Sequence, residues 1–216
     1  MIKSWNEMDL AHYRKLLDVI RKEWENELDM NLAMVSVLSD ISLEEIQNME
    51  LNKLQELINN LKFVESPYKP KTPETKYIIG DREYRVFFNV NKMTASQYID
   101  FQNFYKKYDD FMPNIAACFL LPNGKKYGED YDPIDEAEFL NNHLTIDVFS
   151  DIMFFFVNLL RLSTLITLHS SEKEMKKELK KTKNKLERIK ILRSLIQTRR
   201  LVLLLKNEAE LSESIR

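Results

Sequence analysis

The chain has 216 residues, of which 44% are hydrophobic and 11% aromatic, so it can bury a sizeable core and does not belong to the disordered class. Only three glycines occur, which argues against glycine-rich loops that cradle phosphates and favours helices. The formal net charge is −2, and the single cysteine, Cys118, excludes a disulfide within the chain and favours a reducing compartment.

The first 64 residues predict a small helical unit of three or four helices. Ser4 and Glu7 have the S-x-x-E spacing of a capping box and precede apolar residues at helical spacing. Ser42 and Glu45 repeat this spacing and predict the start of a short helix. Apolar residues at intervals of three and four continue beyond it and predict one further amphipathic helix.

A linker and a hairpin are expected next. Prolines at every third position within residues 65–76 break helix and predict an extended linker, which is the clearest internal boundary of the chain. Directly after it, the alternation over residues 77–88 around Gly80 and Asp81 predicts a β-hairpin. No other strand is expected. Because two strands alone are marginally stable, the hairpin must lie on helices or on the edge of a partner.

The rest of the segment 77–170 is expected to be helical. Thr94 and Gln97 have capping-box spacing and predict a helix start, and the aromatic stripe of that helix is expected to belong to the core rather than to stack on bases. A helix is expected over residues 114–121, where a proline ends it, and another over residues 134–140.

An apolar helix is expected over residues 146–169. Its stretch 152–168 lies at the lower edge of membrane-spanning length, with Asn158 and Arg161 near its centre. A central arginine costs about 2.5 kcal/mol or more on insertion. We therefore expect a buried helix in a soluble protein, with a membrane span as the disfavoured alternative.

A basic arm is expected to end the chain. Ser170 and Ser171 are expected to separate the apolar helix from a last helix over residues 172–207 that carries a partial heptad. Residues 171–216 hold 14 basic and 7 acidic side chains, a net of +7, whereas the other 170 residues hold 18 and 27, a net of −9. This division predicts binding to an acidic partner, or contact between the arm and the body of another copy. Interspersed glutamates and the lack of aromatic residues favour a solvated or protein-binding face over a nucleic-acid contact.

No catalytic, cofactor or metal site is predicted, and the protein is not expected to be an enzyme. His12, His143 and His169 lack the spacing of metal ligands, and Cys118 lies in an apolar run that favours a buried side chain over a nucleophile. The acidic cluster over residues 129–138 lacks the ligand spacing of a calcium loop, so it is expected to be solvated or to be a docking surface for a basic arm.

Four segments, residues 78–86, 93–101, 115–122 and the phenylalanine-rich 149–156, together resemble small proteins of tailed bacteriophages that are grouped with tail assembly chaperones, particularly in phages of Bacteroidetes-type hosts. The resemblance covers residues 77–160 and consists of spacing and residue class. It implies a non-enzymatic role in which the protein binds aggregation-prone virion components during assembly, above all the tape measure protein. The long basic arm also suits a structural virion protein, such as a ring or connector in which copies interlock.

We therefore predict a mainly α-helical protein: a helical bundle with one small β-hairpin and a long C-terminal basic helix, divided into residues 1–64, 65–76, 77–170 and 171–216. It is expected to bind other phage proteins in the cytoplasm of the bacterial host or in the virion, without a cofactor. A homo-oligomer is an open alternative, nucleic acid is less favoured, and a membrane is disfavoured. The predicted partner-binding residues lie on the arm and on the acidic loop: Lys176, Lys177, Lys180, Lys181, Arg199, Arg200, Asp130, Asp132, Asp135 and Glu136.

Overall fold

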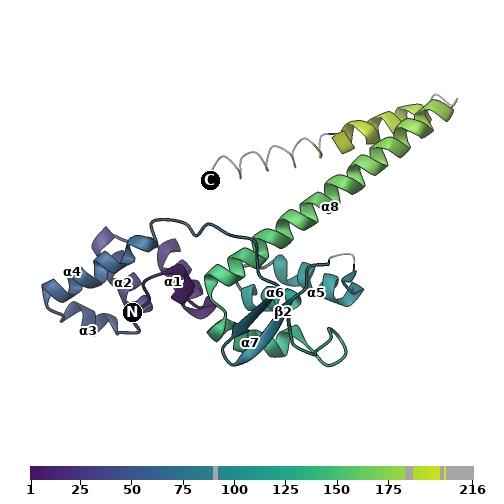
Figure 1. Ribbon diagram of the computed structural model, residues 1–216. Coiled ribbons are helices and arrows are strands. Elements are labelled where there is room, and N and C mark those ends of the chain that lie inside the picture. Colours follow the sequence, from purple (N-terminus) through teal and green to yellow (C-terminus); the bar gives the residue numbers. More distant parts are fainter. Residues whose placement is uncertain (90–91, 183–186, 200–201, 203–216) are drawn as a thin grey trace. The chain divides into compact units, whose positions relative to one another are not determined.

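The computed structural model describes residues 1–89, 92–182, 187–199 and 202, and within them the protein is mainly α-helical with a small antiparallel sheet (Figure 1). The predicted fold class is confirmed. The chain divides into two compact units, of which the first is Met1–Phe155 and the second is Phe156–Arg216. The predicted boundaries at residues 64 and 76 thus fall inside the first unit, and the one at residue 170 falls inside the second.

The N-terminal helices of the first unit begin at polar caps. Ser42 and Glu45 form the predicted capping box, each side chain accepting a hydrogen bond from the backbone N–H of the other. The capping box predicted at Ser4 is wrong, because the Ser4 side chain makes no cap bond. The first α-helix begins later, where the Asp9 carboxylate accepts the His12 N–H at 2.8 Å. The elements are η1 (Trp5–Glu7), α1 (Leu10–Arg21), α2 (Glu27–Ser39), α3 (Leu43–Gln47), α4 (Leu51–Asn59) and η2 (Asn60–Phe63).

Backbone hydrogen bonds tie the start of the chain to the junction between α7 (Pro133–His143) and α8 (Ile146–Lys181). The Leu10 N–H donates to the Leu144 carbonyl at 3.0 Å, and the Ile146 N–H donates to the Met8 carbonyl at 2.7 Å. Helix α1 also packs against α2 and α7. The N-terminal helices and the later helices therefore share one compact unit.

The proline-containing linker is held by a carboxylate on α8. Residues 67–74 lie outside helices and strands, as an extended linker should. Asp151, which is 9% exposed, accepts hydrogen bonds from the Tyr68 hydroxyl at 3.0 Å and from the Lys71 backbone N–H at 2.7 Å. The linker is therefore anchored along its length rather than attached only at its ends.

The sheet has three antiparallel strands in the order β1 (Lys76–Ile79), β2 (Arg82–Val86) and β3 (Leu120–Pro122). The predicted hairpin is confirmed, and Gly80 in its turn has a φ of 59°, a conformation that favours glycine. In the second ladder, Val86 of β2 lies opposite Leu120 of β3.

The third strand corrects two predictions, that no other strand exists and that a helix runs to residue 121. Helix α6 (Met112–Phe119) ends at Phe119, and the next three residues pair with β2. Leu120 and Leu121 are both buried. An apolar run buried on both sides has no alternation by which the sequence distinguishes a strand from a helix.

Helices α5 (Ala95–Tyr105) and α7 pack against α6, of which every residue except Asn114 is buried. The predicted start of α5 is confirmed, because the Thr94 hydroxyl accepts the Gln97 N–H at 3.2 Å. The expected aromatic core stripe is only partly present. Phe101 is buried, whereas Tyr98 and Tyr105 are 45% and 43% exposed.

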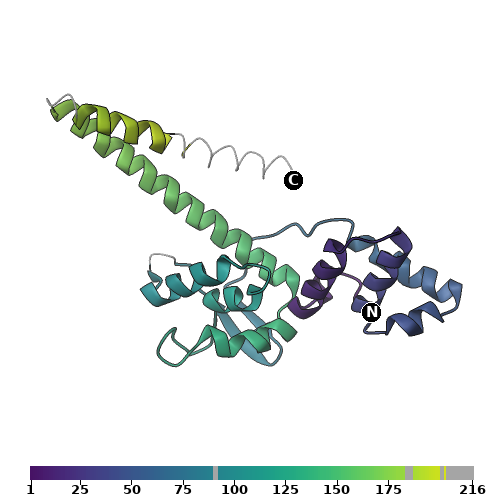
Figure 2. The ribbon, with the colours of Figure 1, turned by 180° about the vertical axis from the view of Figure 1, so that it is seen from behind.

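Helix α8 continues through Ser170 and Ser171 to Lys181, so the predicted break at these serines is wrong. Serine lowers helix propensity by less than about 1 kcal/mol and does not by itself end a helix. Residues 187–199 are helical again and lie beside α8 in both views (Figures 1 and 2), so the single helix predicted over residues 172–207 is also wrong. We call residues 156–181 and 187–199 the arm hairpin.

Burial along α8 largely ends at Phe156. Ile152, Met153 and Phe156 are buried, but Val157 is 41% and Ile166 is 66% exposed, and only 19% of the most apolar window of the helix is buried. The expected buried helix over residues 152–168 is therefore buried only in its first turns. Among the described residues, α8 is the one helix long and apolar enough to span a membrane by length and composition.

Candidate protein-binding surfaces

The arm hairpin carries the predicted basic residues, and two of them form ion pairs with Glu172: Lys176 within α8, and Arg199 across from the second helix. Lys176 lies 2.6 Å and Arg199 lies 3.0 Å from the same oxygen of Glu172. The Lys176 ammonium and then the Arg199 guanidinium lower the pKa of the Glu172 carboxyl. Lys177, Lys180 and Lys181 are exposed, and Arg200 lies outside the described residues.

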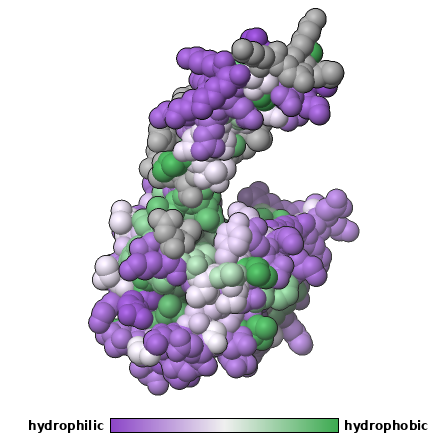
Figure 3. All heavy atoms as spheres, turned by 90° about the vertical axis from the view of Figure 1, so that its right-hand side faces the viewer, coloured by the Kyte–Doolittle hydropathy of each residue, from purple (hydrophilic) through white to green (hydrophobic). Residues whose placement is uncertain are grey.

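The second helix of the arm hairpin has two apolar stripes. Leu195 is 7% exposed, and Val202, which lies beyond the arm hairpin, is 8% exposed. Ile189, Leu192 and Ile196, at the spacing of three and four that places residues on one helix face, are 42%, 42% and 52% exposed. We call these three residues the outer stripe. Figure 3 shows hydrophobic atoms exposed along part of the arm hairpin, with mainly hydrophilic atoms over its end.

The acidic loop is built into the fold more than the sequence suggests. Asp132 caps α7 by accepting the Ile134 N–H at 2.8 Å. Asp130 accepts the Lys126 N–H at 2.7 Å, and this hydrogen bond is the largest cause that lowers the pKa of the Asp130 carboxyl. These two carboxylates therefore support the local backbone as well as carrying charge.

The last two acidic residues of the predicted surface differ sharply. The Glu136 carboxylate is 14% exposed, lies 2.9 Å from the Arg82 guanidinium and accepts a hydrogen bond from the buried Tyr84 hydroxyl. Asp135 is exposed and, among the described residues, makes no side-chain hydrogen bond or ion pair. Of the four predicted acidic residues, Asp135 is thus the one whose charge is not engaged within the described fold.

A cleft of about 460 Å³ lies beside the sheet, and no pattern in the sequence predicts it. Its lining includes Arg85, Phe87 and Leu121, the loop around Tyr127, and Thr94 at the start of α5. These residues come from four separated segments, so neither their spacing nor their composition indicates in advance that they meet. Adjacent phenylalanines such as Phe87 and Phe88 also occur in ordinary hydrophobic cores, so they do not indicate a cleft.

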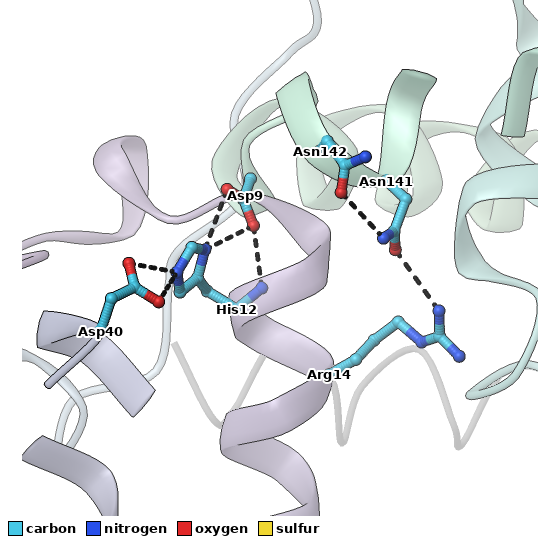
Figure 4. A network of polar contacts seen from close by, with 6 residues as sticks. All are labelled: Asp9, His12, Arg14, Asp40, Asn141 and Asn142. Carbon is cyan, nitrogen blue, oxygen red and sulfur yellow. Dashed lines mark hydrogen bonds and ion pairs between the residues drawn. The ribbon is translucent and has the colours of Figure 1, made fainter. Parts of the chain in front are cut away.

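His12 lies between two carboxylates in the first unit (Figure 4). Its Nδ1 is 2.8 Å from Asp9 Oδ1, and its Nε2 is 3.2 Å from the carboxylate of Asp40, a residue whose φ of 54° ends α2. Nearby, the Arg14 guanidinium donates to the Asn141 side-chain oxygen at 3.3 Å. These contacts join α1 to α2 and α7. Among the described residues, neither this trio nor any other group of His, Cys, Asp and Glu side chains has an arrangement that could hold a metal ion.

Cys118 is a buried side chain, as predicted. Burial raises the pKa of its thiol to about 12, which keeps the thiol protonated at neutral pH. The Tyr127 hydroxyl lies 3.7 Å from its sulfur and donates to Asp100 at 2.9 Å. This environment suppresses the thiolate that a nucleophile requires.

Comparison of the chain with protein-family models, curated proteins and solved structures gives no match.

Proposed function

We propose that the protein acts without catalysis, by binding another protein during bacteriophage assembly in the host cytoplasm, in the manner of a chaperone for a tail component. The observation that carries this proposal is the outer stripe. Three large apolar side chains are exposed on a helix that also presents Arg188, Lys190 and Arg193. Such a helix face gains stability when an apolar surface of a partner covers it, because burying apolar area contributes about 25 cal/mol per Å².

The net positive charge of the arm hairpin indicates which class of partner it binds. The described residues 171–182 and 187–199 hold nine basic and four acidic side chains. A second arm hairpin would bring like charges together, which is unfavourable, whereas a partner with acidic residues beside its apolar stripe would be attracted. An amphipathic helix with carboxylates beside its apolar stripe has this chemistry, and we propose that the virion partner presents such a helix.

Co-expression with a tape measure protein of a Bacteroidetes-type phage tests the proposal. The wild-type chain is expected to raise the soluble fraction of the tape measure protein and to be purified with it. Replacing Leu192 and Ile196 with serine should abolish both effects, because it removes most of the outer stripe. Gln197→Ser changes an exposed polar residue of the same helix and is the matched control. If the double variant were as effective as the wild type, the outer stripe would not be the binding surface.

A structural virion role is a second candidate, favoured by the opposite net charges of residues 1–170 and 171–216. It predicts self-association through contact between the arm of one copy and the body of the next. Light scattering would then give an oligomer at low salt that dissociates at high salt, and Lys177→Glu with Lys180→Glu would prevent its formation. A protein that stays monomeric at low salt would exclude this role. Binding of the same lysines to nucleic acid would instead appear as an affinity for oligonucleotides that falls steeply with salt.

A further inference from the structure

We propose that the cleft beside β2 and β3 is a second binding site, for an extended peptide segment of another protein that combines apolar side chains with carboxylates. The cleft lies wholly within the first unit, so this site is independent of the arm hairpin and of the function proposed for it.

The floor of the cleft is apolar and fixed by the sheet. Leu121 lies opposite Arg85 in the β2–β3 ladder, on the face away from the buried Tyr84 and Val86 side chains. The Phe87 N–H extends the ladder by donating to the Phe119 carbonyl at 2.9 Å. A floor of this kind does not need to rearrange before a ligand binds, and a volume of about 460 Å³ accommodates a few side chains.

The rim of the cleft is basic although the body as a whole is acidic. Four cationic residues line it, Arg85, Lys92, Lys125 and Lys126, together with one acid, Glu129. Lys126 lies 3.3 Å from Glu129, and Lys125 lies 3.7 Å from Asp130, which lies outside the lining.

The other two cations, Arg85 and Lys92, have no carboxylate within ion-pair distance among the described residues. The N-terminus of α5 at Thr94 adds the partial positive charge of a helix start. Carboxylates on a ligand would therefore be attracted to this rim, while lysines or arginines would be repelled.

The aromatic rings of the cleft favour a peptide over a nucleic acid. Base stacking requires an open ring face. Phe88 is instead packed edge-to-face against Phe155, with ring centroids 5.1 Å apart, and Tyr127 packs in the same way against Tyr131 at 5.9 Å. Phe87 is half-buried. Apolar side chains of a peptide can cover rings that are already packed against a neighbour, whereas a base requires a ring face open for stacking.

Fluorescence anisotropy with two labelled peptides tests the proposal. The acidic probe places leucines between aspartates, and the basic probe has the same leucines between lysines. The full-length protein is expected to bind the acidic probe at least tenfold more tightly than the basic probe. Arg85→Glu with Lys92→Glu should weaken binding of the acidic probe at least tenfold, because both residues line the cleft without a carboxylate partner.

The control carries the same charge change outside the cleft. Lys62→Glu with Lys106→Glu alters two exposed lysines of the first unit and should change the affinity less than twofold. Phe87→Ser tests the apolar floor and should also weaken binding tenfold, with circular dichroism to check that the variant is folded. Equal affinity for the two probes would overturn the proposal, as would equal effects of the cleft and control variants. An oligonucleotide that bound in place of the acidic probe, and lost binding in the cleft variant, would overturn it as well.

Discussion

Replacing Asp151 tests whether the linker is held to α8 as the structure describes. The Asp151 carboxylate is largely buried and accepts two hydrogen bonds, from the Tyr68 hydroxyl and the Lys71 N–H. Asp151→Ala removes both and leaves two donors without their acceptor. Hydrogen bonds to charged groups contribute about 1.5 to 3 kcal/mol each. Because Tyr68 is only half-buried and water can replace part of the loss, we expect the variant to lose about 3 kcal/mol of unfolding free energy.

Asparagine at the same position separates the hydrogen bonds from the charge. Asp151→Asn keeps an acceptor oxygen for both donors, so its cost at pH 7 should stay below about 1 kcal/mol. Burial is the largest cause that raises the pKa of the Asp151 carboxyl above its ordinary value of 3.8, although the Lys71 N–H and the Tyr68 hydroxyl oppose it.

A raised pKa in the folded state gives the stability of the wild type a defined dependence on pH. The folded protein holds the Asp151 proton more tightly than the unfolded chain does. The resulting stability is fully present below the unfolded value of 3.8 and is lost as the pH rises through the folded value. Relative to Asp151→Asn, the wild type should therefore become more stable as the pH is lowered from 7 towards 4.

Urea unfolding of the wild type, Asp151→Ala and Asp151→Asn at pH 7 and near pH 4.5 gives the cost of each substitution and its dependence on pH. Asp110→Asn, at an exposed aspartate, controls for the loss of one negative charge and should change stability little at either pH. The reasoning would be refuted if Asp151→Ala were no more destabilising than Asp151→Asn. It would also be refuted if the difference between the wild type and Asp151→Asn did not depend on pH.

Three further predictions concern single side chains. Gly80→Ala should lower the free energy of unfolding in denaturant by about 2 kcal/mol, because the residue has positive φ and the added Cβ would lie 2.9 Å from a neighbouring ring carbon. Gly124→Ala also has positive φ but open space around it, so it should lower the free energy of unfolding by only about 1 kcal/mol. Glu136→Ala should cost about 2 kcal/mol by leaving a buried tyrosine hydroxyl without its acceptor, and Asp135→Ala less than about 0.5 kcal/mol; equal costs would contradict the structure. Because burial raises the pKa of the Cys118 thiol to about 12, iodoacetamide at pH 8 should label the folded protein at least about a hundredfold more slowly than the urea-unfolded chain.

Helix caps could be predicted from the sequence where no second capping residue lies nearby. Ser42 and Thr94 cap their helices as expected. At Ser4 the same spacing misleads, because Asp9 offers a better cap a few residues later and the intervening chain forms a 3₁₀ turn instead. A short motif thus indicates that a cap is available but not which of two nearby caps the chain uses.

Features that depend on distant pairing could not be predicted. The strand β3 exists because Leu120 meets Val86, and the cleft exists because that ladder brings Leu121 beside residues from the loop before α7. Glu136 looks like one more carboxylate in an acidic loop, and only its contact with Arg82 and Tyr84 reveals it as part of the fold. Residue type and spacing along the chain do not predict these contacts between distant residues.

The arm combines a property that the sequence determines with one that it does not. The excess of basic residues follows from counting, but the heptad-like spacing of apolar residues suits both a single long helix and two helices packed side by side. The ion pair between Glu172 and Arg199, 27 positions apart, distinguishes the two. Folding back brings the lysines of residues 173–181 next to the basic residues of 188–199, so the positive charge is concentrated on a shorter surface than a single helix would give. This concentration strengthens attraction to an acidic partner and opposes pairing of two arms, which is why we favour a partner protein over self-association through the arm hairpin.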